Sequence, residues 1–248
     1  MDPTTIDALV RDSGCMARLI APEFRATPLY ILTQSRLPPE YRVAGCDGFV
    51  SATLDLELRD VIGPDWRGRG GCIVVEDDAP AVRGRDYAEA RLWFRSLVAH
   101  ELAHLLEWPT PFLPFAADAQ PSREYLHDRS VATAARLSDP DRAAVLSSHN
   151  GHGVEFFRVL LHLRHRAEGC GFELEPWKFL LGPGVGSRAE QLRHYEDALG
   201  DELYRLRSAP FAEIKAAPVP MRMVGLWMDD MGLHPGNDAV DRLIAGAS

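Results

Sequence analysis

The four cysteines of this 248-residue chain stand far apart. Cys15, Cys46, Cys72 and Cys170 include no CxxC pair, so the sequence indicates neither a structural zinc ribbon nor a thiol redox pair. A chain of this size does not need a disulfide to fold, and we interpret the four residues as reduced thiols of a cytoplasmic protein.

The sequence also lacks a long hydrophobic run. Its start, Met1-Asp2-Pro3, has neither the basic nor the apolar region of a secretory signal. The most apolar late stretch, residues 218–228, is short and contains Arg222. We therefore expect no membrane span, no export signal and no membrane partner.

Basic residues are in deficit. The chain has 27 Lys and Arg against 36 Asp and Glu, which gives a formal net charge of −9. Because binding to a phosphate backbone relies on clustered Lys and Arg, this charge disfavours nucleic acid as a partner. The hydrophobic fraction of 46% is enough for one globular unit with a substantial core.

Hydrophobic periodicity predicts two strands in the first 80 residues. The alternation of Leu54, Leu56 and Leu58 with charged residues predicts a half-buried strand near residues 49–60. A compact β-branched run at residues 72–76 predicts a second strand, and residues 29–32 form a further short apolar run.

Three helices are predicted downstream. Asp86 and Glu89 have the spacing of a capping box, and no Gly or Pro follows until Pro109, which predicts a helix over residues 87–107. Further helices are expected over residues 154–168, before Gly169, and over 187–207.

Prolines divide the chain between the first two of these helices. We interpret residues 109–150, which contain five prolines, as an insertion or lid. The predicted organisation is a catalytic domain at residues 1–169 and a mainly helical C-terminal extension at 170–248 that packs on the same core.

The strongest functional signal is an HExxH sequence, His100-Glu101-Leu102-Ala103-His104, inside the helix predicted over residues 87–107. Residues four apart lie one helical turn above each other, so the two imidazoles can bind one zinc ion. Glu101 is suited to accept a proton from a zinc-bound water as a general base. The flanking residues make this helix apolar nearly all round, and buried polar groups without a metal would be costly there.

A catalytic zinc ion normally has three protein ligands and one open position. One candidate for the third ligand is His152, which lies between two glycines at the start of the second helix. The other is Glu124, twenty positions after His104 and four before Asp128, a spacing that resembles thermolysin-like gluzincins. His149 is a further alternative.

The two segments His100-Glu101-Leu102-Ala103-His104 and Gly151-His152-Gly153-Val154-Glu155-Phe156 together resemble the SprT-like metallopeptidases, in which HExxH is followed by a GHGxEF-type segment. The resemblance covers residues 72–168 and implies His152 as the third zinc ligand. It also implies a zincin-like α/β (α+β) fold, in which a small mixed sheet packs on the HExxH helix.

The expected function is hydrolysis of peptide bonds in a peptide or protein substrate by a zinc-bound water that Glu101 activates. Two alternatives remain. One is a gluzincin-type peptidase with Glu124 as the third ligand, and the other is a non-enzymatic protein in which a fully ligated zinc stabilises a binding surface.

Overall fold

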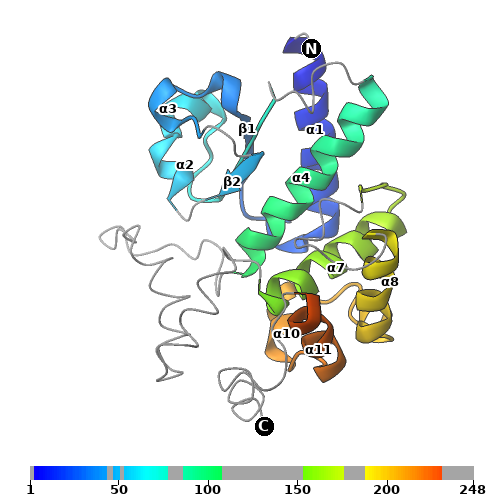
Figure 1. Ribbon diagram of the computed structural model, residues 1–248. Helices are drawn as coiled ribbons and strands as arrows, with labels where there is room; N and C mark the ends of the chain where they lie inside the picture. The colour runs from blue at the N-terminus through cyan, green and yellow to red at the C-terminus, as the bar shows by residue number, and fades with distance from the viewer. Residues whose placement is uncertain are drawn as a thin grey trace.

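The computed structural model describes residues 3–43, 47–50, 53–77, 86–107, 153–175 and 188–230, and it has a mixed α+β fold (Figure 1). A small sheet lies on one side of two long helices, α1 (Pro3–Ile20) and α4 (Tyr87–Glu107). The remaining long helices gather at one end of this pair. The α+β class predicted from the sequence is therefore confirmed.

The sheet has three strands among the described residues, in the order β1-β3-β2. β1 (Leu29–Thr33) pairs parallel to the central β3 (Gly71–Val75), and β2 (Gly48–Val50) pairs antiparallel to it. β3 is buried along its whole length, which fits a β-branched run covered on both faces. The strand predicted at residues 72–76 is thus confirmed within one residue.

α4 has the bounds that the sequence predicts. Its capping box is formed, because the Glu89 amide donates to Asp86 Oδ1 at 2.9 Å and the Asp86 amide donates to Glu89 Oε2 at 3.3 Å. The helix packs against α1, β2, β3 and α7 (Val154–Gly169). It is therefore the central element of the fold.

The strand predicted near residues 49–60 is present at residues 49–50 and wrong over residues 54–60. Residues 54–62 form two short helices, α2 (Leu54–Glu57) and α3 (Arg59–Ile62). Leu54 and Leu58 are buried one helical turn apart, whereas Leu56 is 42% exposed. Leucines at every second position fit the two-residue repeat of a strand, and the outer two also fit one turn of a helix. Packing in the folded protein stabilises the helical arrangement.

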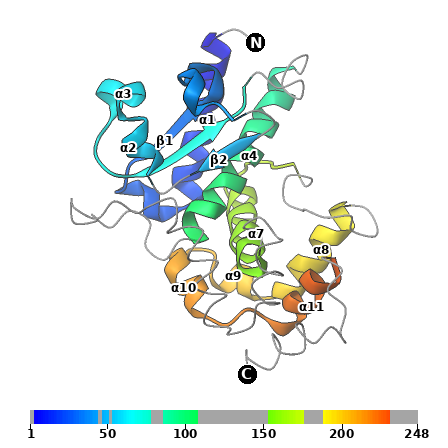
Figure 2. The same cartoon turned by 60° about the vertical axis from the view of Figure 1, so that its left-hand side comes forward.

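The single helix predicted over residues 187–207 is divided in two. α8 (Arg188–Leu199) ends at Gly200, whose φ of 54° lies in the left-handed region that favours glycine, and α9 (Glu202–Arg205) follows. α10 (Phe211–Ala216) and α11 (Met221–Asp230) complete the described part. Figure 2 shows α8 beside α7, and α9, α10 and α11 below it.

The two faces of the sheet contact different clusters of buried side chains. Ile73 and Val75 of β3 belong to the main cluster, which also draws residues from α1, α4, α7, α8, α10 and α11. Cys72 and Val74 belong to a smaller cluster that includes Leu54 and Leu58. The described C-terminal helices therefore share one core with the N-terminal helices.

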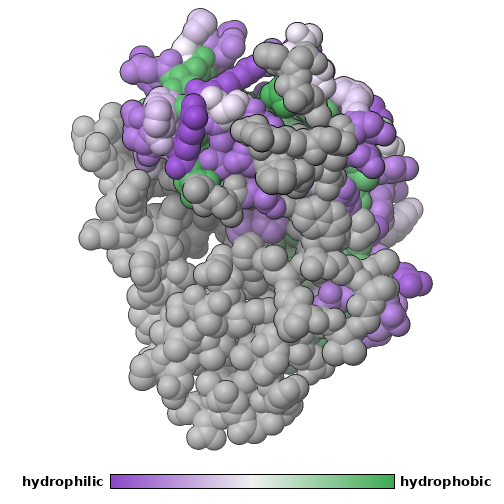
Figure 3. Space-filling view, turned by 45° about the horizontal axis from the view of Figure 1, so that its top comes forward, coloured by the Kyte–Doolittle hydropathy of each residue, from purple (hydrophilic) through white to green (hydrophobic). Residues whose placement is uncertain are grey.

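The part of the described surface that is visible in Figure 3 is largely polar. On the face drawn in Figure 3, the residues that carry colour are mostly hydrophilic, with small apolar areas between them. None of the helices in the described ranges combines the length and apolar character that a membrane span requires. The lid predicted at residues 109–150 lies outside the described residues, so the division into domains stays a prediction.

Candidate metal-binding and catalytic site

α4 brings three of the predicted site residues together on consecutive turns. The ring centroids of His100 and His104 are 5.2 Å apart, with an interplanar angle of 75°. Both imidazoles are partly exposed, whereas Glu101 between them in sequence is only 5% exposed. The expectation that α4 is internal is met along most of its length, since every residue from Trp93 to Ala99 is buried.

The spacing of the two rings fits one zinc ion. Zinc binds imidazole nitrogen at about 2.0–2.1 Å with tetrahedral geometry, which places the centroids of two bound rings about 5 Å apart. The observed 5.2 Å agrees with this value. Imidazole is also a preferred zinc ligand. The distance between the two rings is therefore compatible with a shared zinc ion, and zinc binding stays a prediction.

Glu101 lies against the backbone of β2. A Cβ added at Gly48 would stand 3.0 Å from Glu101 Oε1 and 3.2 Å from Leu97 Cδ1. Only a residue without a side chain allows the strand to approach the helix this closely without displacing one of these atoms. Gly48 thus forms part of the wall that confines the Glu101 carboxylate.

Phe156 of α7 packs against the rings of both histidines. The Phe156 ring centroid lies 4.3 Å from that of His104, tilted by 30°, and 5.0 Å from that of His100, at 65°. Phe156 is fully buried. Aromatic pairs at such distances stabilise by about 0.5–1.5 kcal/mol beyond the area that they bury.

The opposite face of α7 carries a buried ionic cluster. Arg158 donates through Nε and Nη2 to the two carboxylate oxygens of Glu202 at 2.8 and 3.0 Å, and through Nη1 to the Ala217 carbonyl at 2.7 Å. His162 Nε2 lies 2.9 Å from Glu202 Oε1 and donates to it, because a carboxylate can only accept. This cluster fastens α7 to α9 and to the segment before α11.

Burial and hydrogen bonding shift the pKa values of Glu202 and His162 in opposite directions. Burial alone would raise the pKa of Glu202, but the bonds from His162 and Arg158 outweigh it and lower the pKa to about 2. Burial lowers the pKa of His162, against the opposing effect of Glu202. His162 is therefore neutral and Glu202 ionised near neutral pH.

Arg158, His162 and Arg166 of α7 are buried, although arginine residues mostly lie on the surface of proteins. Arg158 and His162 are 0% exposed and Arg166 is 7% exposed. Arg166 donates to the carbonyls of Ile20 and Leu206 at 3.1 Å each, so it joins the end of α1 to the C-terminal helices. The hydrogen-bond partners of these three side chains lie far away in the sequence, so no local sequence pattern predicts the burial.

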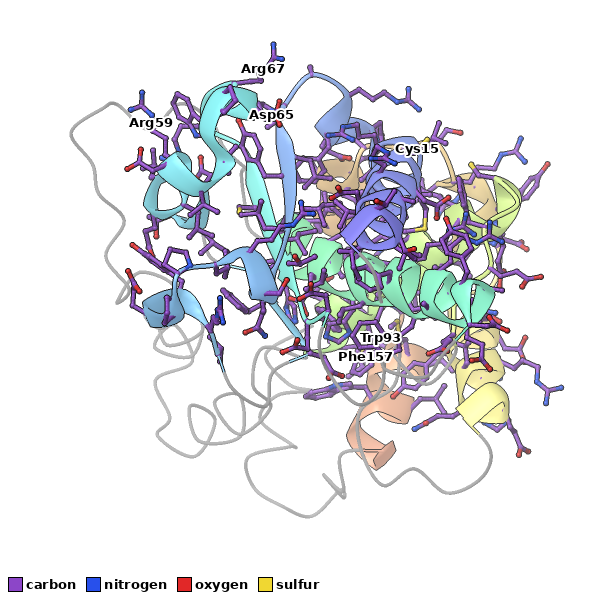
Figure 4. All side chains as sticks on the ribbon, turned by 90° about the horizontal axis from the view of Figure 1, so that it is seen from above. Cys15, Arg59, Asp65, Arg67, Trp93 and Phe157 are labelled. Atoms are coloured by element: carbon purple, nitrogen blue, oxygen red, sulfur yellow. The ribbon has the colours of Figure 1, made fainter. Side chains whose placement is uncertain are left out.

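Figure 4 shows aromatic side chains in the interior of the molecule and basic side chains at its periphery. Trp93 of α4 and Phe157 of α7 lie in the centre, whereas Arg59 of α3 and the nearby Arg67 point outward. The guanidinium of Arg59 stacks on Trp66, 4.5 Å from the ring centroid. The neighbouring Arg69 donates to buried Asp55 at 2.8 Å, so its charge is already paired.

The candidate third ligands His152, Glu124 and His149 lie outside the described residues, as does Asp128. Within the described ranges, no group of three or more His, Cys, Asp and Glu residues converges as a metal site. The choice among these ligands stays a prediction.

Sequence reasoning assigned no role to Gly48 or Phe156. A glycine inside a strand can indicate the close approach of another group, and this signal was available for Gly48. Phe156 stands four positions after the predicted ligand His152 in the sequence, but an apolar residue at that position is equally expected of an ordinary core contact.

Comparison with protein-family models, with curated proteins and with solved structures found no match to this chain. The resemblance to SprT-like metallopeptidases and the zincin-like fold therefore stay predictions.

Proposed function

We propose that this protein is a zinc-dependent metallohydrolase that cleaves peptide bonds. The observation that carries the proposal is the arrangement on α4, where two partly exposed imidazoles have the spacing of zinc ligands and a buried carboxylate lies beside them. The GHGxEF-type segment supports the same conclusion, with His152 as the third ligand.

Zinc held by these residues would act as a Lewis acid that acidifies a water molecule and polarises a carbonyl group. Glu101 accepts a proton from the attacking water and transfers it to the departing amine. Its burial against Gly48 restricts the carboxylate to one region, which favours a fixed direction of proton transfer.

The position of β2 favours an extended peptide as substrate. β2 is one of the two edge strands of the described sheet, and its Gly48 lies close to Glu101. Extended peptides commonly bind by adding to the edge of a sheet, since their main chain then pairs with the strand. A peptide that paired with β2 would pass close to the Glu101 carboxylate.

The test compares zinc-loaded wild type with Glu101→Gln and His104→Ala on unfolded casein and on a mixture of short peptides. We expect one zinc per chain in wild type and in Glu101→Gln, and loss of zinc in His104→Ala. Turnover by Glu101→Gln should fall by about 10²–10⁴-fold, because Gln keeps the shape of Glu but cannot accept the proton.

An exposed control is Glu213→Gln on α10, which should bind zinc and turn over as wild type does. Zinc-dependent turnover that Glu101→Gln retains in full would remove Glu101 from the mechanism. Stoichiometric zinc without turnover in wild type, on either substrate, would favour the non-enzymatic zinc-stabilised binding protein.

A further inference from the structure

Phe156 contacts both histidines of α4 from a different helix. Its ring is nearly parallel to that of His104 and closer to perpendicular to that of His100, at centroid distances of 4.3 and 5.0 Å. The same ring packs edge-to-face on Phe157, 5.7 Å away. One rigid, fully buried side chain therefore limits the rotation of both imidazoles.

Contacts on the opposite face of α7 fix the orientation of Phe156. In a helix of 3.6 residues per turn, positions two apart point in roughly opposite directions, so Phe156 and Arg158 lie on opposite faces of α7. Arg158 and His162 lie one turn apart and both bind the Glu202 carboxylate of α9. This anchor prevents α7 from rotating about its axis and keeps Phe156 directed at α4.

We propose that Phe156 is a positioning residue of the metal site: its ring holds His100 and His104 in the orientations in which both can bind one ion. This inference rests on the proposed zinc site. Free imidazoles would have to lose rotational freedom when the metal binds, whereas the packed rings have lost it already. Outer residues that orient metal ligands typically contribute about 10–100-fold to metal affinity.

The chain offers a matched control in the next residue. Phe157 is also buried, at 3% exposure, but it stacks on Tyr195 at 5.8 Å. Phe156→Leu and Phe157→Leu remove the same ring from adjacent positions of one helix. They differ in whether the lost ring contacts the histidines.

The experiment measures the zinc dissociation constant by chelator competition, and the visible absorption spectrum of the cobalt-substituted protein, for wild type and both variants. Urea unfolding is recorded in parallel. We expect Phe156→Leu to weaken zinc binding by roughly 10–100-fold and to change the cobalt bands. Phe157→Leu should lose stability but keep the wild-type zinc affinity and spectrum. Phe156→Met, which fills most of the volume without a rigid ring, serves as a second variant if the leucine variant does not fold.

The outcomes separate this inference from the proposed function. If wild type binds zinc and Phe156→Leu or Phe156→Met binds it equally tightly with an unchanged cobalt spectrum, Phe156 is only a core residue and the inference is overturned. An equal loss of affinity in Phe157→Leu would overturn it as well. If wild type binds no zinc, the proposed function fails, and the inference fails with it.

Discussion

The ionic cluster behind α7 predicts a large loss of stability when Glu202 loses its charge. The pKa of Glu202 is lowered from 4.5 to about 2. Since a change of one in pKa corresponds to about 1.4 kcal/mol, the charged form contributes about 3 kcal/mol to folding. The typical cost of removing one partner from a buried ion pair is similar, at about 3–5 kcal/mol.

Glu202→Gln keeps the shape of the side chain but leaves Arg158, which is 0% exposed, without a charged acceptor on α9. We expect the free energy of unfolding at pH 7 to fall by about 3 kcal/mol. With a urea m-value of about 2 kcal/mol per molar, the unfolding midpoint moves down by about 1.5 M. Glu213→Gln, at an exposed position, should change the free energy by less than about 0.5 kcal/mol.

The effect should also depend on pH. A carboxyl with a lowered folded-state pKa stabilises the protein above its unfolded pKa of 4.5, and this contribution is lost as the pH falls toward 2. The lowered pKa of His162 acts in the same direction, because the unfolded chain binds its proton first as the pH falls below 6.5. Wild type and Glu202→Gln should therefore differ less in stability at pH 3 than at pH 7.

Urea titrations followed by far-UV circular dichroism at both pH values test this reasoning. A loss below about 1 kcal/mol at pH 7 would refute the role of Glu202 as the charged partner of Arg158, since breaking a buried pair costs more than this. An equal difference at pH 7 and pH 3 would refute the pKa argument.

Two further predictions concern the proposed active site. His152→Ala should strongly reduce zinc affinity, as measured by chelator competition, whereas Glu124→Ala should leave it nearly intact; the reverse order would favour the gluzincin pattern. Gly48→Ala should lower kcat about 10-fold with zinc retained. The new Cβ, 3.0 Å from Glu101 Oε1, displaces the carboxylate by about 0.5 Å, and about 1 Å of misplacement costs about 10²-fold. Gly225→Ala, whose Cβ meets nothing within 4 Å, is the control, and equal turnover in the two alanine variants contradicts the argument.

The elements that the sequence predicted well are those whose signals are local. α4 begins after a capping box and reaches Glu107, as the pattern of Asp86, Glu89 and Pro109 predicts. β3 contains a compact β-branched run, which has a local preference for strand. The capping box of α4 joins residues close in sequence, whereas β3 also needs its distant partners, since Leu29 of β1 pairs with Gly71.

The wrong predictions arose where a local pattern admits two solutions. Leu54, Leu56 and Leu58 fit a strand or a helical turn, and burial of Leu54 and Leu58 in the smaller core decided for helices. Charged residues on a helix are usually exposed. Arg158 is instead buried because its acceptor Glu202 comes from 44 residues away, a distance that no sequence window covers.

The sequence by itself determined the chemistry that α4 can present. The i, i+4 spacing places His100 and His104 on one face of any helix that contains them, and it puts Glu101 next to the first. Only the tertiary structure decided what surrounds these residues. Phe156 reaches the imidazoles because α7 is anchored from behind, and Gly48 confines Glu101 because β2 packs onto α4. Helical spacing is a property of backbone hydrogen bonds between near neighbours, whereas these contacts join residues more than fifty positions apart and exist only once the core has formed.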